Sequence, residues 1–323
     1  MTLRATIQGI GHYLPERVVE NAEFEKTIDT TDAWIRSRSG IERRHFAADG
    51  ETTSMLGAKA ALAALADAGV EPDEVDALIV ATSTPDLTFP SAATMIQAEI
   101  GMTRGFAFDV QAVCAGFAYA MTTANAMIVS GQAQRALVIG AETFSRLMDW
   151  TDRGTCVLFG DGAGAVLLEA RNAAGTSDDA GILAAEILSD GRHKDILYVD
   201  GGVSTHTTGH LRMQGKEVFR HAVEKLAGTA RTTLAKAGLE PKDVDWVVPH
   251  QANLRILTAM AERLHVPMDN FIVTLQDHGN TSAASIPLAL SVAKADGRLQ
   301  PGNLVVTGAI GGGLAWGSVV FRV

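Results

Sequence analysis

Three separated segments of the sequence carry a thiol, an imidazole and a carboxamide in positions that favour chemistry. Cys114 follows the strand-like run 110–113 and stands at the start of a predicted helix. A cysteine at a helix N-terminus faces the positive end of the macrodipole, which favours the thiolate by about 0.3–1 kcal/mol, or up to ~2 kcal/mol when the group is partly buried. The residue type alone leaves two interpretations open, a nucleophile and a buried structural cysteine.

His250 and Asn280 are the other two candidates. His250 comes directly after a predicted buried strand, and catalytic groups in α/β folds gather at the carboxyl ends of strands. A neutral imidazole there can donate a hydrogen bond to a developing oxyanion or shuttle a proton. Asn280 follows Gly279 and precedes a predicted helix, where asparagine also serves as a turn or capping residue. Both residues therefore have structural alternatives, and the neighbouring His278 is a rival catalytic histidine.

Two glycine-rich segments have different expected uses. Gly311-Gly312-Gly313 lies between two apolar runs, and its backbone N–H groups could approach a ligand as an oxyanion hole or allow a tight bend. The segment 160–164 resembles a phosphate loop only at first sight, because it lacks the GxGxxG spacing and the Lys-Ser/Thr pair. We expect it to be a tight turn into a strand over residues 165–168.

Three further features each have a structural and a functional interpretation. Cys156 lies in a strand-like apolar run and is expected to pack in the core. His206 and His210 are four residues apart with no carboxylate between them, so we expect no metal site. Trp34 and Arg38 are four residues apart on a predicted helix, and this pair suits either a flat phosphorylated ligand or a plain surface contact.

The elements that must position these residues alternate between strands and helices. Short β-branched apolar runs predict buried strands over residues 78–81, 136–140, 244–248 and 304–307. Ala-rich stretches with helical periodicity predict helices over residues 53–68, 91–100, 116–130, 217–237 and 282–296. This alternation predicts an α/β architecture with helices packed on sheets.

An internal repeat divides the chain into two halves. Residues 65–76 and 234–245 are identical at eight of twelve positions, at an offset of 169 residues. Both copies read as a helix that ends at glycine, a proline turn and a buried strand. We predict two related halves, residues 1–170 and 171–323, joined by a connector over 170–181. If the halves face each other, Cys114, His250 and Asn280 meet near the axis, and the long loop over 190–215 is a further functional candidate.

Composition excludes several classes of protein. The chain has 323 residues, 47% of them hydrophobic and 20% charged, which excludes disorder as the main state. The formal charge of −10 argues against a nucleic-acid partner. Two cysteines exclude a disulfide scaffold and a Cys-rich zinc site and fit a reducing compartment. With no signal-peptide pattern and no apolar run of membrane-spanning length, we expect a cytoplasmic protein of enzyme size.

Four motifs in this order resemble the β-ketoacyl-acyl carrier protein synthase III family. They are Ala-Val-Cys-Ala-Gly-Phe around Cys114, and the runs 248–255, 278–285 and 311–317. The resemblance extends from Gly9 to Ser318. It implies the thiolase fold, a duplicated five-layered α/β/α/β/α arrangement, and a condensing enzyme that starts type II fatty acid synthesis.

The resemblance also implies roles for particular residues. Cys114 would take an acyl group from acyl-CoA, with acetyl-CoA favoured, and the backbone N–H groups of Cys114 and Gly312 would form the oxyanion hole. His250 and Asn280 would hold the thioester of malonyl-acyl carrier protein during decarboxylation. No cofactor is expected, since acyl-CoA is a substrate.

Binding positions follow from the same resemblance. The positions that match coenzyme A contacts are Thr30, Trp34, Arg38, Arg153, Gly215, Phe219, Ala252 and Asn253, with the adenine between Trp34 and Arg153. The positions near the mouth that suit an acidic carrier protein are Arg220, Arg255 and Arg263. Phe89 matches a residue that crosses a homodimer interface to cap the acyl pocket, which Ile310 also shapes.

The chain departs from the family pattern at three positions. Lys216 replaces a common asparagine, Glu262 a common basic residue, and Ile310 a common aromatic residue before the glycines. These changes bear on coenzyme A contacts, carrier contacts and pocket shape, respectively.

Four competing interpretations are weaker. A thiolase would need a second cysteine before the C-terminal glycines, and a hydroxymethylglutaryl-CoA synthase would need a glutamate near residues 81–85; neither is present. The Cys–His–Asn spacing of 136 and 30 residues fits a papain-like hydrolase, but the local motif around its cysteine is missing. A non-catalytic acyl-CoA scaffold would not need all three reactive groups. A specialised relative of secondary metabolism remains the alternative function.

Overall fold

The structure, a computed structural model, describes residues 2–323 and contains two large mixed sheets. The first has the strand order β1 (Thr2–Tyr13), β7 (Asp161–Ala173), β6 (Arg135–Thr143), β4 (Ala77–Ala81) and β5 (Phe106–Val110). The second has the order β8 (Gly181–Ser189), β13 (Ala315–Arg322), β12 (Leu304–Gly311) and β11 (Trp246–Pro249). Two ribbons accompany them, β2 (Arg17–Glu20) with β3 (Arg43–Phe46), and β9 (Leu197–Val199) with β10 (Leu211–Met213).

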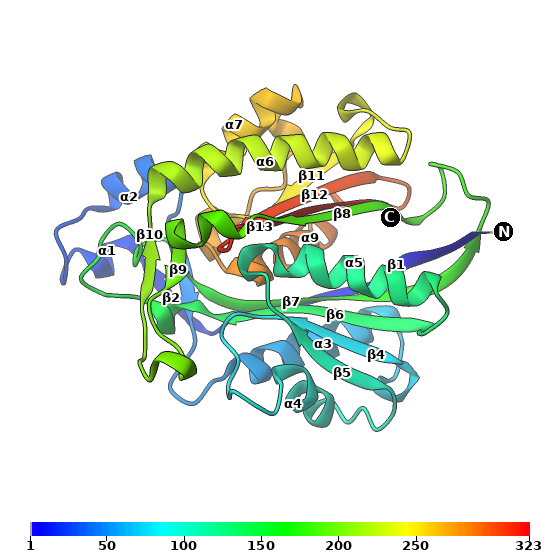
Figure 1. Ribbon diagram of the computed structural model, residues 1–323, viewed down its shortest axis with the longest axis horizontal. Helices are drawn as coiled ribbons and strands as arrows, with labels where there is room; N and C mark the ends of the chain where they lie inside the picture. Colours follow the sequence, from blue (N-terminus) through cyan, green and yellow to red (C-terminus); the bar gives the residue numbers. More distant parts are fainter. Residues whose placement is uncertain (1) are drawn as a thin grey trace.

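Helices cover both outer faces and fill the space between the sheets. The helices are α1 (Asn21–Phe24), α2 (Asp32–Ser39), α3 (Thr53–Ala68), α4 (Ala92–Glu99), α5 (Gly116–Val129), α6 (Gly215–Lys236), α7 (Leu254–Leu264), α8 (Leu275–His278) and α9 (Ser285–Ala295). Helices α3 and α4 pack on the first sheet, α6 and α7 cover the second, and α5 and α9 contact both (Figure 1). This stacking confirms the predicted five-layered α/β/α/β/α fold.

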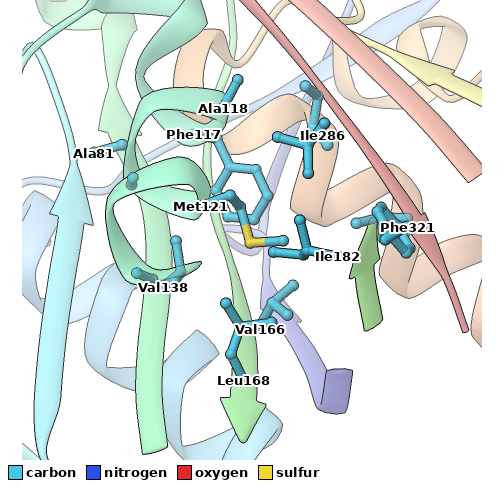
Figure 2. Close-up of a cluster of buried hydrophobic side chains, with 14 of the residues drawn as sticks. Ala81, Phe117, Ala118, Met121, Val138, Val166, Leu168, Ile182, Ile286 and Phe321 are labelled. Atoms are coloured by element: carbon cyan, nitrogen blue, oxygen red, sulfur yellow. The ribbon is translucent and has the colours of Figure 1, made fainter. Parts of the chain in front are cut away.

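The largest cluster of buried apolar residues surrounds the central layer. Helices α5 and α9 are covered on both sides, and Phe117 and Met121 of α5 are buried. Figure 2 shows these two side chains between Val166 and Leu168 of the first sheet and Ile182 of the second, with Phe321 beyond Ile182. Each sheet therefore depends on the central helices to bury its inner face.

The two sheets have matching topology at the predicted offset. Strands β4 and β6 are parallel and β6 and β7 antiparallel, and β11, β12 and β13 repeat these directions. The repeated segments form equivalent proline turns at 72–74 and 241–243, each closed by reciprocal carboxylate capping bonds. The predicted boundary at residue 170 falls inside β7, and the link between the sheets covers residues 174–180.

The equivalence reaches the turns that precede the central helices. We call residues 113–115 the Cys114 turn and residues 282–284 the Ser282 turn. Val113 has φ +50° and Ser282 has φ +49°, and these positions are 169 residues apart. Such left-handed values are rare outside glycine, especially for a β-branched residue. The two turns contact each other across the halves.

Some local predictions were wrong. Residues 161–164 lie inside β7, where the glycines let α9 approach: a Cβ on Gly164 would lie 2.8 Å from the Leu288 nitrogen. Cys156 is fully buried as expected, but in a turn hydrogen-bonded to the Asp152 carbonyl rather than in a strand. The loop over 190–215 contains the β9–β10 ribbon. The other predicted strands and helices form, with ends shifted by a few residues.

Candidate active site

A cavity of about 1520 Å³ joins the two halves of the chain. Cys114, His250, Asn280 and Gly312 all line it. Its other walls come from α2, the N-terminal end of α6 and the β9–β10 ribbon. The structure thus places all three candidate reactive side chains, which are distant in sequence, around one space.

The Cys114 turn holds the thiol at the inner end of α5. The Ala115 N–H donates to the Ala112 carbonyl at 3.0 Å, and the helix begins at Gly116, two residues after the cysteine. Burial raises the pKa of the Cys114 thiol to about 12. The predicted preference of the helix dipole for thiolate is therefore outweighed by desolvation, and the resting group is the neutral thiol.

Gly311 of β12 supports this turn from the opposite half. A Cβ on Gly311 would lie 2.7 Å from the Cys114 nitrogen and 2.7 Å from the Ala112 carbonyl oxygen. Only a residue without a side chain fits at that distance. The first glycine of the triple therefore serves close packing, while Gly312 lines the cavity beside Cys114.

His250 follows β11 and is held as a neutral imidazole. Its Nδ1 lies 2.7 Å from the Ser285 hydroxyl, and burial lowers its pKa to about 3. The Ser285 oxygen already accepts from the Gln251 N–H at 3.3 Å. The hydroxyl proton is thus free to bond Nδ1, which leaves the Nε2–H of His250 as a donor towards the cavity.

Asn280 is fixed so that its amide group also acts as a donor. Its Oδ1 accepts the Ser282 N–H at 2.9 Å, and its backbone bonds both Leu158 and Gly160. With the oxygen occupied, the Nδ2–H₂ group is the part left for a ligand. His278, the rival histidine, does not line the cavity; burial lowers its pKa to about 4.

The predicted coenzyme A positions fall mostly on the cavity wall. Those that line it are Trp34, Arg38, Gly215, Phe219, Ala252 and Asn253. Thr30 and Arg153 do not. The Arg153 guanidinium lies 5.2 Å from the Trp34 ring centroid and donates to the Asp29 carbonyl at 2.6 Å. Since two stacking contacts of about 3.5 Å each need more room, an adenine between Trp34 and Arg153 requires the arginine to swing away from Asp29.

The remaining predicted residues are distributed over the mouth and the surface. Arg255 and Ile310 line the cavity, whereas Arg220 lies outside it and bonds the Glu217 carboxylate at 2.7 Å. Arg263 also lies outside. Phe89 is 83% exposed and does not reach the acyl pocket of its own chain.

No motif indicated a role for Ser285, and Lys216, which replaces a common asparagine of the family, lines the cavity. Ser285 stands one helical turn after Ser282 in an Ala-Ser-rich run, and only the fold shows that its hydroxyl meets His250. Among residues 2–323, no group of three or more His, Cys, Asp or Glu side chains could hold a metal ion. In the same residues, no helix is long and apolar enough to cross a membrane.

Comparisons with known proteins agree with this arrangement. Residues 108–202 match the family described as 3-Oxoacyl-[acyl-carrier-protein (ACP)] synthase III, and residues 234–323 match its C-terminal part. The chain is 74% identical over 322 residues to the β-ketoacyl-[acyl-carrier-protein] synthase III of Cereibacter sphaeroides, with 100% of both chains covered. It is 71% identical to that of Ruegeria pomeroyi, again over 100% of both chains.

Solved structures give the same result. The crystal structure of 3-oxoacyl-[acyl-carrier-protein] synthase III from Aquifex aeolicus matches with a TM-score of 0.93 and 44% identity, covering 99% of this chain and 100% of the other. A priming β-ketosynthase of a polyketide pathway has the same fold at 34% identity and a TM-score of 0.92, covering 100% and 98%. The cavity, its three reactive groups and these whole-length similarities lead to one conclusion: the chain belongs to the β-ketoacyl-[acyl-carrier-protein] synthase III family.

Proposed function

We propose that Cys114 is the nucleophile of a condensing acyltransferase that starts fatty acid synthesis. Its sulfur attacks the thioester carbonyl of acyl-CoA, and coenzyme A leaves as the acyl group moves to the enzyme. The N–H groups of Cys114 and Gly312 stabilise the oxyanion of this step, and one such donor is typically worth about 10²–10³ in rate. Covalent catalysis thus divides one acyl transfer into two easier steps.

The second step uses the other two residues. Malonyl-acyl carrier protein enters with its thioester carbonyl between His250 and Asn280. Loss of CO₂ leaves an enolate, whose negative charge two neutral donors stabilise more than they stabilise the uncharged thioester. The enolate carbon then attacks the acyl group on Cys114 and releases the 3-oxoacyl product. These steps need no cofactor.

The observation that carries this proposal is the state of the two donors. His250 is neutral by burial and its Nδ1 faces Ser285, while the Asn280 oxygen is occupied by Ser282. Both side chains therefore present N–H donors, not acceptors, to the cavity. That polarity suits an enolate oxygen and not the protonation of a leaving group.

Intact mass tests the proposal directly. The protein is mixed with acetyl-CoA, its intact mass is measured, and malonyl-acyl carrier protein is then added as the chase. We expect one acetyl group on the wild type and on Cys156→Ser, since Cys156 is buried outside the cavity, and none on Cys114→Ser. The chase should return the free enzyme and yield acetoacetyl-carrier protein.

Each other outcome points to a different function. An acetyl group that survives the chase would indicate an acyltransferase with another acceptor, as in a specialised relative of secondary metabolism. Loading by a longer acyl-CoA alone would replace acetyl-CoA as the starter. No loading by any acyl-CoA would end the case for Cys114.

We propose that the wall from Trp34 and Arg38 to Asn253 binds coenzyme A. The Asn253 amide is held by the Arg38 carbonyl at 3.0 Å, which joins α2 to the start of α7 at the cavity mouth. Arg255 faces the cavity beside it, and with Arg220 and Arg263 it supplies positive charge for an acidic carrier protein. Raised KM values for acetyl-CoA in Trp34→Ala, and for the carrier substrate in Arg255→Ala, are the tests.

We also propose a homodimer in a reducing cytoplasm. Phe89 is too exposed for a large aromatic side chain, and β5 is an edge strand that pairs only with β4 in residues 2–323. A second copy would cover both and bring Phe89 to the partner's acyl pocket. Both cysteines are free thiols, as a reducing compartment allows. Analytical ultracentrifugation of wild type and Phe89→Asp would test the dimer.

A further inference from the structure

A buried carboxyl group lies behind the nucleophile and has no part in the steps above. Glu142 is fully buried near the end of β6. Its Oε2 accepts the Thr84 hydroxyl at 2.7 Å, the Ser83 N–H at 3.1 Å and the Thr82 hydroxyl at 3.3 Å. Its Oε1 has no hydrogen-bond partner among residues 2–323. One oxygen is thus fully anchored and the other is left over.

The strand geometry shows where this carboxyl points. Gly140 and Glu142 lie on the same face of β6, because side chains alternate along a strand. A Cβ on Gly140 would lie 2.3 Å from the Ala283 carbonyl oxygen, so this face meets the Ser282 turn. Burial raises the pKa of Glu142, and the Ser282 side chain and the Ala283 N–H on this turn oppose that rise.

Ser282 interacts with both Glu142 and Cys114. Its side chain opposes the rise in the pKa of Cys114 as well as that of Glu142. Its buried hydroxyl completes a regular hydrogen bond with neither group, and the turn that carries it contacts both β6 and the Cys114 turn. A hydroxyl can both donate and accept a proton, and this one acts on both the thiol and the carboxyl group.

We propose that Glu142, acting through the Ser282 hydroxyl, takes up the proton of the Cys114 thiol during acylation and returns it after condensation. Glu142 is a positioning residue in this scheme, since it holds the proton without contacting substrate. The inference rests on the proposed role of Cys114 as the nucleophile.

The proton balance closes over the two steps. During acylation the thiol proton passes to the Ser282 oxygen as the serine's own proton passes to Glu142, and the sulfur bonds the acyl carbon. Coenzyme A leaves as a thiolate and takes a proton from water. During condensation the bond between the acyl carbon and the sulfur breaks, the sulfur keeps the electron pair, and the reverse transfer restores the thiol and the carboxylate.

Base strength favours Glu142 over His250 for this task. Burial raises the pKa of Glu142 to about 7, whereas burial lowers that of His250 to about 3. The carboxylate is therefore the stronger base of the two. At neutral pH it is about half ionised, which suits a group that must accept and release a proton in each cycle.

The charged surroundings leave this exchange undisturbed. The elements that pack on this face of β6 are α5, α9 and the Ser282 turn, and the ionisable group whose charge Glu142 affects is Cys114. His250, which lines the same cavity, is neutral and bonded to Ser285. Asp161 neighbours Thr143 on the other face and bonds Ser145, while Asp86 bonds Ser54.

The test is the pH profile of single-turnover acylation, measured by rapid mixing with acetyl-CoA and intact mass. For the wild type we expect the rate to rise as pH passes through about 7. Glu142→Gln should lose about 10²-fold or more at pH 8 and lose this rise. Ser282→Gly removes the hydroxyl at a φ that glycine tolerates and should show the same loss. The double variant should lose no more than either single one.

A control variant and the pattern of rates separate this role from a structural one. Asp161→Asn makes the same carboxyl-to-amide change at another buried site, and it should keep the wild-type profile. A wild type that never acylates would refute the proposed function itself. If the wild type acylates and Glu142→Gln acylates as fast or faster, only the proton transfer is refuted. The carboxylate would then be a negative charge that opposes thiolate formation. A loss that is equal at every pH would also overturn the proposal, since it indicates a structural defect.

Discussion

Replacing Gly311 by alanine should disable the nucleophile without unfolding the protein. The new Cβ would stand 2.7 Å from the Cys114 nitrogen, where ordinary contact begins at 3.4 Å. The Cys114 turn must therefore move by about 0.7 Å. Since misplacement of a reacting group by about 1 Å can cost 10²-fold in rate, we expect acylation to slow by about 10–100-fold.

The cost in stability should be modest. Overpacking typically destabilises by about 1–3 kcal/mol. With an unfolding entropy of about 2.1 cal/mol/K per residue, a chain of 323 residues loses about 1.5 °C in Tm for each kcal/mol. The expected fall in Tm is thus about 2–5 °C, well short of unfolding at 25 °C.

The assay compares two glycines of the same strand. Acetyl-enzyme formation is followed by rapid quench and mass spectrometry, and Tm by circular dichroism. Gly308→Ala is the matched control, because its Cβ would meet Leu226 and Met260 at an ordinary 3.6 Å; it should acylate normally. Wild-type acylation in Gly311→Ala, or equal losses in both variants, would refute the idea that Gly311 positions the Cys114 backbone.

Three other predictions follow from the structure. Gly228→Ala, at an exposed interior position of α6 with nothing within 4 Å of the new Cβ, should stabilise the fold by about 0.5–1 kcal/mol and raise Tm by about 1 °C; an unchanged or lower Tm in calorimetry would count against it. His250 and His278 have folded pKa values of about 3 and 4, below the unfolded value of about 6.5, so the stability they retain above pH 6.5 is lost as pH falls towards 4. Each histidine should lower the free energy of unfolding by about 2 kcal/mol between pH 7 and 5. Urea unfolding of His278→Gln should show about half of the wild-type pH dependence, and an equal pH dependence would exclude a contribution from His278. Ser285→Ala frees the His250 tautomer and should slow condensation by about 10-fold or more while leaving acylation within about twofold, so a matched loss in both half-reactions would contradict the donor role.

Local structure was predictable where local chemistry decides it. The span predicted for α3 agrees with the structure, since Thr52 caps its start and Gly69 ends it at φ +64°. In β7, close approach by α9 made glycine necessary, and the sequence shows only the glycine. A turn and a tightly packed strand look alike when the partner helix is more than a hundred residues away.

The candidate site divides in the same way. The motifs identify Cys114, His250 and Asn280, and the repeat suggested that they meet, because residue types and order survive in the sequence. The charge state of Cys114 was not predictable, since the helix dipole is a local property whereas burial depends on both halves. Glu142 gave no signal at all, because a single carboxylate in an apolar strand shows neither its depth nor its neighbours.

Because the turns at Val113 and Ser282 match, the two halves of the chain are arranged like the two subunits of a symmetric dimer. Their shared backbone twist and mutual contact are those of an isologous interface, in which each copy presents the same patch. Perfect symmetry would give two nucleophiles facing each other. Here the second position is Ala283, whose methyl group is buried, and its neighbour carries a hydroxyl. The two halves differ at two adjacent pairs of residues, Val113 with Ser282 and Cys114 with Ala283. This difference gives the interface between the halves one nucleophile instead of two.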